Sequence, residues 1–258
     1  MKNKELTFWG HLEELRQMLF RMIVALVALM VVVFLCKSFV FDTVILAPRS
    51  SDFILYRWLC AVSDTFSLAN LCPEPFHLDL ININLSSQFL LHLSTSFWIA
   101  LILGFPYLIW ELWRFVAPAL YPKEQRNIKN AFIFSSLLFY IGVAVAYLMV
   151  FPFALHFLGN YQVSAEVKNH ISLQSYISSL TSLVLAMGIV FEFPVLIHIL
   201  SRIGVVNRAV LRKYRRHAIV VLLILAAIIT PPDVFSMIIA VIPLYLLYEI
   251  SILTCKEG

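Results

Sequence analysis

Long apolar runs separated by polar stretches dominate the pattern of hydrophobic and polar positions along the chain. A helix rises about 1.5 Å per residue, so about 20 apolar residues cross the hydrocarbon layer of a bilayer. The pattern predicts an all-α membrane protein with six transmembrane helices, near residues 18–35, 89–110, 131–158, 176–200, 218–230 and 234–250. The last two runs are shorter than the hydrocarbon layer requires.

The segments between these runs predict the rest of a single integral membrane domain, 1–258. Residues 1–17 carry apolar side chains at helical spacing and predict a short interfacial helix. Residues 37–87 hold five acidic side chains and three prolines, so they are too polar and broken to span. We expect them to form an ordered cap of short helices, with an extended segment near 78–85. The stretches 111–129 and 159–174 are expected to be polar loops, and 201–217 is a basic stretch.

Composition and the placement of charge settle the class and the orientation. The 258 residues are 61% hydrophobic and 13% charged, whereas soluble domains carry about 25% charged residues. With six spans, fifteen of the nineteen Lys and Arg residues fall on the side of both termini. Basic residues mark the cytoplasmic side, so we expect cytoplasmic termini and a multi-pass protein of the cell inner membrane. The basic runs act as orientation signals and require no nucleic acid.

One carboxylate lies inside a predicted span. Glu192 stands about two thirds along 176–200, and Pro194 follows it and predicts a kink. A charged carboxylate near the bilayer centre costs about 2.5–3.5 kcal/mol on the insertion scale. Two interpretations stay open: Glu192 locks helix packing as a polar group, or it has a functional role facing other helices or water. The second would also suit a small-solute secondary transporter in which Glu192 is the coupling carboxylate.

The four cysteines fall into two classes. Cys36 and Cys255 lie at membrane edges on opposite sides, whereas Cys60 and Cys72 share the 37–87 stretch. In an oxidising compartment the latter two could form a disulfide. Sequence does not place their Cα atoms within the about 4.4–6.8 Å that a bridge needs, so a bridge and two free thiols both remain open.

The chemistry in the sequence points to binding. No Gly-rich phosphate loop, zinc-type His–Glu spacing or nucleophile elbow is present, which predicts neither an enzyme nor a cofactor or metal site. A set of carboxylates stands on the basic cytoplasmic side or edge: Glu13, Glu14, Glu111 and Glu124. Either they pair with neighbouring Arg and Lys, or two of them from separate segments form a site for guanidinium groups.

Several separated motifs resemble the TatC family, the large membrane subunit of the twin-arginine protein translocase. They are His11-Leu12-Glu13-Glu14-Leu15-Arg16, FPYLIWELWRFVAPALY at 105–121 followed by Glu124 and Arg126, GIVFEFP at 188–194, TPPD at 230–233 and YEI at 248–250. The resemblance covers nearly the whole chain in the same order. It implies a curved, glove-like bundle that binds twin-arginine signal peptides of folded cargo and exports that cargo with the proton-motive force.

The resemblance also implies residue roles. Glu14 and Glu124 would take the two signal-peptide arginines, and His11, Arg16 and Phe115 would shape that site. Further roles would be a concave intramembrane site for Glu192, a contact with the single-helix TatA and TatB subunits for Thr230 and Asp233, and a place in the outward cap for Pro48. The implied partners are TatA, TatB, twin-arginine signal peptides, the lipid bilayer and further copies of the chain in a homo-oligomeric complex.

Three positions depart from the family pattern. The family often has a second Arg in the opening motif, where this chain has Met18, and Gln where this chain has Glu111 and Met237. The stretch around Cys60 and Cys72 is also longer than usual.

Overall fold

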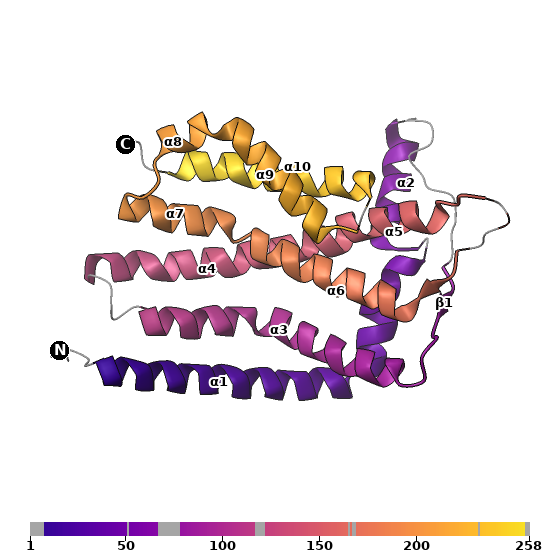
Figure 1. The fold of residues 1–258 in the computed structure, drawn as a ribbon, viewed down its shortest axis with the longest axis horizontal. Helices are drawn as coiled ribbons and strands as arrows, with labels where there is room; N and C mark the ends of the chain where they lie inside the picture. The colour runs from indigo at the N-terminus through magenta and orange to yellow at the C-terminus, as the bar shows by residue number, and fades with distance from the viewer. Residues whose placement is uncertain are drawn as a thin grey trace. The chain divides into compact units, whose positions relative to one another are not determined.

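The computed structural model describes residues 8–50, 52–66, 78–116, 122–164, 166, 169–231 and 233–255, and only the backbone of residues 8, 64–66, 116, 122–131 and 203. The described elements are helices apart from two strands of two residues each (Figure 1). Five helical stretches are long and apolar enough to cross a membrane: Trp9–Leu35, Ser87–Phe115, Phe132–Asn160, Leu173–Arg202 and Val234–Thr254. The prediction of an all-α, multi-pass membrane protein is therefore confirmed.

The chain divides into two compact units, residues 1–37 with 92–137 and residues 38–91 with 138–258. The first unit contains α1 (Phe8–Leu35), most of α3 (Ser87–Val116) and the first part of α4 (Pro122–Val145). The second unit contains, in chain order, η1 (Phe39–Ile45), η2 (Ala47–Arg49), α2 (Ile54–Phe66), β1 (Leu80–Ile81), η4 (Ala146–Val150), α5 (Phe151–Asn160), β2 (Ile171–Ser172), α6 (Leu173–Val190), α7 (Phe193–Ile203), α8 (Arg208–Lys213), α9 (Arg215–Ile229) and α10 (Val234–Thr254).

In the first unit α1 and α3 run antiparallel. Near one end the ring of Phe34 stacks on His92, with centroids 3.9 Å apart, and His92 Nε2 lies 3.1 Å from the Phe34 carbonyl oxygen. Further along, Gly104 lets α1 approach closely, because a Cβ at that position would lie 3.1 Å from Leu29 Cδ1. These interactions fix the register in which the N-terminal end of α1 meets the C-terminal end of α3.

Two sequence-based boundaries in this unit are corrected by the structure. Helix α1 runs unbroken from Phe8, so residues 8–17 are its first turns and not a separate interfacial helix. The expected polar stretch 111–129 is mostly helical, because α3 continues to Val116 and α4 begins at Pro122. A drop in hydropathy marks where a helix leaves lipid, whereas hydrogen bonding and capping decide where the helix ends.

Two spans of the second unit are interrupted beside a proline. Residues 146–150 form a π-helical turn, η4, directly before α5, whose first turn contains Pro152. Helix α6 ends at Val190, and α7 begins at Phe193 with Pro194 in its first turn. Proline cannot donate an i→i−4 hydrogen bond and crowds the preceding turn, so it fits where a new helix starts. The kink expected at Pro194 is confirmed.

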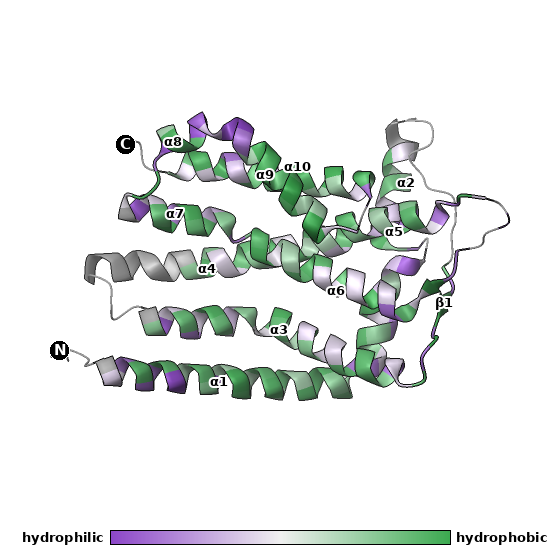
Figure 2. Cartoon of the chain, in the orientation of Figure 1, coloured by the Kyte–Doolittle hydropathy of each residue, from purple (hydrophilic) through white to green (hydrophobic). Residues whose placement is uncertain are grey.

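The last two helices differ in length more than the sequence pattern indicates. Helix α9 has 15 residues, or about 22 Å, which is short for a bilayer. Helix α10 has 21 residues, or about 31 Å, so the helix extends beyond the predicted span 234–250. Its polar end, as far as Thr254, still forms helical turns. Figure 2 shows the apolar character of these helices and the hydrophilic segment at α8 and the start of α9.

Residues 38–91 contain the short helices and the extended segment that the sequence predicts for the cap. Strand β1 pairs in parallel with β2, with Leu80 opposite Ile171. Pro48 of η2 is buried. Cys60 is disulfide-bonded, whereas Cys36 and Cys255 are free thiols. Cys72, the partner expected from the sequence, lies outside the described residues.

Three tyrosine phenols form hydrogen bonds between these short helices and the longer ones. The last carbonyl groups of a helix have no hydrogen-bond donor within that helix. In η1, two of these carbonyl groups accept hydrogen bonds from tyrosine hydroxyls. Tyr147 Oη donates to the Val44 carbonyl at 2.6 Å, and Tyr176 Oη donates to the Ile45 carbonyl at 2.7 Å. Tyr56 Oη of α2 donates to the Pro152 carbonyl at 2.8 Å. Burial raises the pKa of Tyr56, which keeps that phenol protonated as a donor.

Glycines bring α4 and α6 into close contact. A Cβ at Gly142 would lie 2.7 Å from the Met187 carbonyl oxygen, and a Cβ at Gly188 would lie 2.7 Å from Phe139 Cε2. Small residues that let backbones approach are a general feature of helix packing in membranes. Gly142 also receives the ring of Phe191, so this packing supports the chain where α6 ends.

We predict that Tyr176→Phe lowers the free energy of unfolding by about 1–3 kcal/mol, because it removes the donor to a buried carbonyl. The measurement is denaturant unfolding of the purified protein in detergent micelles. Tyr161→Phe is the matched control, since Tyr161 is 60% exposed. Equal destabilisation by both substitutions would contradict the role assigned to the Tyr176 phenol.

Candidate functional site

The structure brings together two of the residues expected to shape a signal-peptide site. The imidazole of His11, in the second turn of α1, stacks on the ring of Phe115 near the end of α3. Their centroids are 4.4 Å apart and their planes are inclined by 23°. The antiparallel pairing of α1 and α3 brings these rings together, although the two residues are far apart in the sequence.

Three charged residues follow His11 on α1. Arg16 Nη2 lies 2.5 Å from Glu13 Oε1, and Gln17 Nε2 donates to the same oxygen at 3.2 Å. The pair lies on the surface, so it contributes little to stability, but it neutralises Glu13. Glu14 is half-buried, and it makes no ion pair or hydrogen bond with the side chains that the structure describes. Of these two neighbouring carboxylates, Glu14 is therefore the one available to a ligand.

Glu124 is the second residue expected to accept a signal-peptide arginine, and the structure describes only its backbone. The backbone of Glu124 belongs to the first turn of α4, Pro122–Val145. A carboxylate in the first turn of a helix is favoured by the helix dipole. The side chain of Glu124 lies outside the described residues, so its distance from Glu14 stays a prediction.

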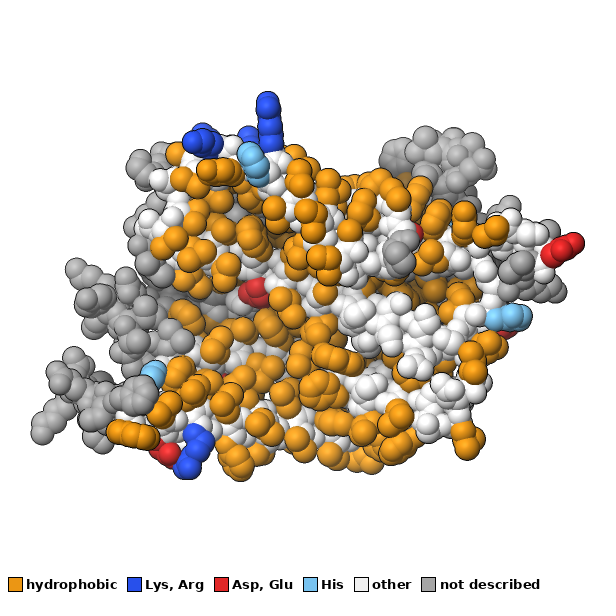
Figure 3. Space-filling model, viewed as in Figure 1, with side chains coloured by type: hydrophobic (Ala, Val, Ile, Leu, Met, Phe, Trp, Pro, Cys, Tyr) orange, Lys and Arg blue, Asp and Glu red, His pale blue; other side chains and the backbone are white. Residues whose placement is uncertain are grey.

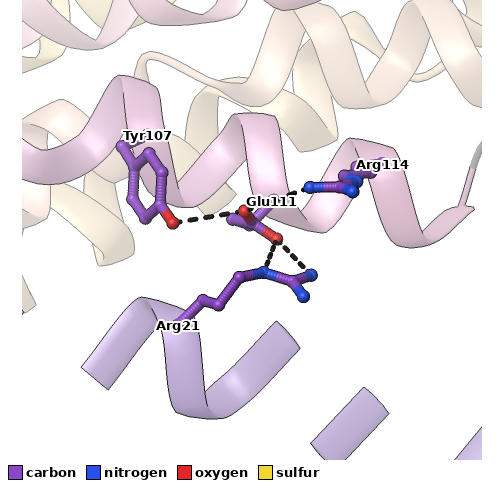
Figure 4. Close-up of polar contacts among 4 residues, drawn as sticks. All are labelled: Arg21, Tyr107, Glu111 and Arg114. Carbon is purple, nitrogen blue, oxygen red and sulfur yellow. Dashed lines mark hydrogen bonds and ion pairs between the residues drawn. The ribbon is translucent and has the colours of Figure 1, made fainter. Parts of the chain in front are cut away.

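A partly buried ion pair joins α1 to α3 further along the two helices (Figure 4). The guanidinium of Arg21 donates twice to Glu111 Oε2, from Nε at 3.0 Å and from Nη2 at 2.8 Å. The other carboxylate oxygen, Oε1, accepts a hydrogen bond from Tyr107 Oη at 3.2 Å and lies 3.9 Å from Arg114 Nη1. The Glu111 side chain is 4% exposed and that of Arg21 is 39% exposed. Glu111 is therefore fully engaged within the protein.

The two interpretations of the acidic set thus apply to different residues. Intramolecular ion pairing describes Glu13 and Glu111, whereas Glu14 remains a candidate acceptor for an external guanidinium. The sequence analysis did not identify Arg21 as the partner of Glu111. The available signal was a pair of opposite charges near the ends of consecutive spans, at a position where the resembled family often has an uncharged Gln.

Glu192 lies at the interruption between α6 and α7. It is the residue before α7, its backbone is helical, and its side chain does not cap that helix. The residue is half-buried and its Oε1 atom is buried. The role of Glu192 in a concave intramembrane site stays a prediction. The structure shows that this residue lies at a break between two helices.

Thr230 and Asp233 form the turn between α9 and α10. Thr230 Oγ1 donates to the Ala226 carbonyl at 2.9 Å, and Asp233 precedes α10 as its N-cap. The Asp233 carboxylate accepts hydrogen bonds from Ser236 N at 2.6 Å and Ser236 Oγ at 2.5 Å. These bonds satisfy helix ends that would otherwise carry orphan polar groups. The contact with TatA or TatB stays a prediction for both residues.

Within the described ranges, no group of three or more His, Cys, Asp or Glu side chains could hold a metal ion. The polar features of this part of the chain include ion pairs, capping interactions and the half-buried carboxylates of Glu14 and Glu192. This arrangement suits recognition of a cationic ligand.

Comparisons with known proteins agree with this geometry. A family model described as "Sec-independent protein translocase protein (TatC)" matches residues 10–243. The TatC protein of Blattabacterium is 36% identical over 256 residues, covering 98% of this chain and 96% of the relative. The Escherichia coli K12 protein is 36% identical over 210 residues, covering 77% of this chain and 79% of the relative.

A solved structure gives the same result. The crystal structure of the twin-arginine translocase receptor TatC in the detergent DDM superimposes with a TM-score of 0.71 at 31% identity, covering 95% of this chain and 99% of that one. These likenesses favour a translocase over a small-solute transporter. By its sequence and its structure, this chain belongs to the TatC family of Sec-independent protein translocase proteins.

Proposed function

We propose that this protein is the receptor that captures twin-arginine signal peptides, and a core subunit of the translocase that exports folded proteins. The observation that carries the proposal is the likeness of almost the whole chain to a solved twin-arginine translocase receptor. Family membership implies a membrane complex with other Tat components. We propose TatA and TatB as these partners, further copies of the chain in the complex, and the proton-motive force as the energy source.

We propose a capture mechanism in which Glu14 and Glu124 each accept one signal-peptide arginine. A carboxylate can accept two parallel N–H···O bonds from a guanidinium, a geometry that lysine lacks. The half-buried state of Glu14 supports this role, because a partly desolvated carboxylate binds a cation more strongly than one in open water. The stacked rings of His11 and Phe115 provide an aromatic surface on which a guanidinium can pack.

The Arg16–Glu13 pair supports selectivity at this site. Arg16 neutralises the neighbouring carboxylate, which leaves Glu14 as the stronger attraction on this face of α1. The Arg21–Glu111 pair supports this selectivity indirectly. The pair joins α1 to α3, so it helps to hold the ring of His11 against the ring of Phe115. We assign Arg21 and Glu111 a positioning role rather than contact with the ligand.

We propose six membrane spans in a curved, glove-like bundle, with α9 as the undersized fifth span. Both termini then lie in the cytoplasm, and residues 37–87 form the outward cap of a protein in the cell inner membrane. The excess of Lys and Arg on the side of the termini supports this topology. Glu192 would face the concave side, and Thr230 and Asp233 would lie near the docking site for TatA and TatB.

We predict that Glu14→Gln and Glu124→Gln each raise the Kd for a twin-arginine signal peptide about 10- to 100-fold, because hydrogen bonds to charged groups contribute about 1.5–3 kcal/mol. The measurement is fluorescence anisotropy of a labelled peptide with the purified protein. Glu13→Gln is the matched control and should change the Kd little, since Glu13 is already paired with Arg16. Equal effects of all three substitutions would refute the assignment.

The positioning role of the Arg21–Glu111 pair predicts non-additive effects. Arg21→Met should lower the midpoint of thermal unfolding by several degrees and weaken peptide binding, since it leaves a buried carboxylate without its main partner. Arg21→Met/Glu111→Met should recover much of both losses. The control pair Arg16→Met and Arg16→Met/Glu13→Met should show no such recovery of stability, because that pair is on the surface. Strictly additive losses at Arg21 and Glu111 would rule out the positioning role.

A further inference from the structure

A group of basic residues follows α7 and extends into the start of α9. We call residues 208–216 the basic segment; it comprises α8 and the start of α9 and contains Arg208, Arg212, Lys213, Arg215 and Arg216. The wider stretch 201–217 contains no Asp or Glu. Figure 3 shows Lys and Arg side chains gathered over the end formed by α8 and the start of α9, beside an apolar surface.

The backbone of this segment is fixed at both of its ends. Gly204, with φ of 86°, ends α7 in the left-handed conformation and turns the chain towards α8. Asn207 Oδ1 accepts a hydrogen bond from Val210 N at 2.8 Å and caps α8. Leu211 is buried, and its carbonyl accepts a hydrogen bond from the buried Tyr248 Oη of α10 at 2.7 Å. The cations are therefore presented by an ordered backbone.

One of these cations already forms an ion pair within the chain. Arg215 Nη2 lies 2.5 Å from Glu249 Oε2, and Tyr245 Oη donates to the other carboxylate oxygen at 2.9 Å. The exposed side chains of Arg212, Lys213 and Arg216 form no ion pair with the acidic side chains that the structure describes. They leave a concentrated positive charge at this end of the unit.

In the six-span topology, the length of the neighbouring helix brings this charge towards the depth of lipid headgroups. Helix α9 begins at Arg215 and has 15 residues, about 22 Å against about 30 Å of hydrocarbon. A span that short draws its flanking cations towards the phosphate level or thins the bilayer. The exposed side chains of Val210 and Tyr214 suit the interface between apolar and polar layers.

We propose that the basic segment binds the headgroups of anionic phospholipids and so anchors the undersized α9. The proposal rests on the six-span topology given above. The orientation of a membrane protein by its positive charges needs only a local excess of Lys and Arg. The basic segment has three further properties: its backbone is ordered, its sequence neighbours include no acidic residue, and it adjoins a short span. Each basic residue near an anionic surface contributes about fivefold in affinity, so the exposed cations together select strongly for anionic lipid.

The test is native mass spectrometry of the purified full chain in micelles that contain equal amounts of phosphatidylglycerol and phosphatidylcholine. The wild-type protein should retain phosphatidylglycerol preferentially. Arg212→Gln/Lys213→Gln should lower that preference about 25-fold at most, at about fivefold per charge. Lys37→Gln/Arg57→Gln removes the same two residue types at exposed positions elsewhere and should leave the preference intact.

Further measurements distinguish lipid binding from the other interpretations of the basic segment. Excess inorganic phosphate should not displace the lipid; displacement would indicate a site for free phosphate and overturn the proposal. Equal retention of both lipids by the wild-type protein, as expected if the basic segment binds an acidic protein segment instead, would also overturn it. Binding of a twin-arginine peptide should be the same in the Arg212→Gln/Lys213→Gln variant as in the wild type. A failure of peptide binding in the wild type would count against the receptor function, while the lipid result would stand.

Discussion

The carboxylate of Glu111 imposes the strongest constraint on the unit that contains α1 and α3. It is almost completely removed from solvent, and an isolated charge in that setting is highly unfavourable. Arg21 meets the requirement with two hydrogen bonds to one oxygen, and Tyr107 bonds the other. Because this interaction joins two helices, it limits how far they can slide past each other. The stacking of His11 on Phe115 is compatible with the register that results.

This constraint also separates structural from ligand-binding charges. Glu111 is paired with Arg21 and Glu13 with Arg16, and Glu14 is the acidic side chain on this part of α1 that we propose as the arginine acceptor. In the second unit, polar groups at helix ends are satisfied by other interactions. There, tyrosine phenols bond the carbonyl groups at the end of η1, and Asp233 caps α10.

The sequence predicted the helical class, the cap elements and the break near Pro194, because apolar runs and proline act locally. It placed several helix ends wrongly. Hydropathy reports the boundary of the lipid, and α1, α3 and α10 each continue beyond it with polar residues in helical turns. The sequence analysis did not predict the Arg21–Glu111 pair, since it joins positions 90 residues apart through a register set by packing. Two of the positions that depart from the family pattern, Met18 and Glu111, lie in the two helices that this pair joins.

The central claim is that acidic side chains at the cytoplasmic ends of the helices capture paired guanidinium groups, and site-specific photocrosslinking tests it most directly. Replacing Phe115 with the photoreactive residue p-benzoylphenylalanine keeps an aromatic ring beside His11. The account predicts a crosslink to a twin-arginine peptide that is lost with a twin-lysine peptide of equal charge and weakened by Glu14→Gln. Equal crosslinking of both peptides, or crosslinking that does not depend on Glu14, would contradict it.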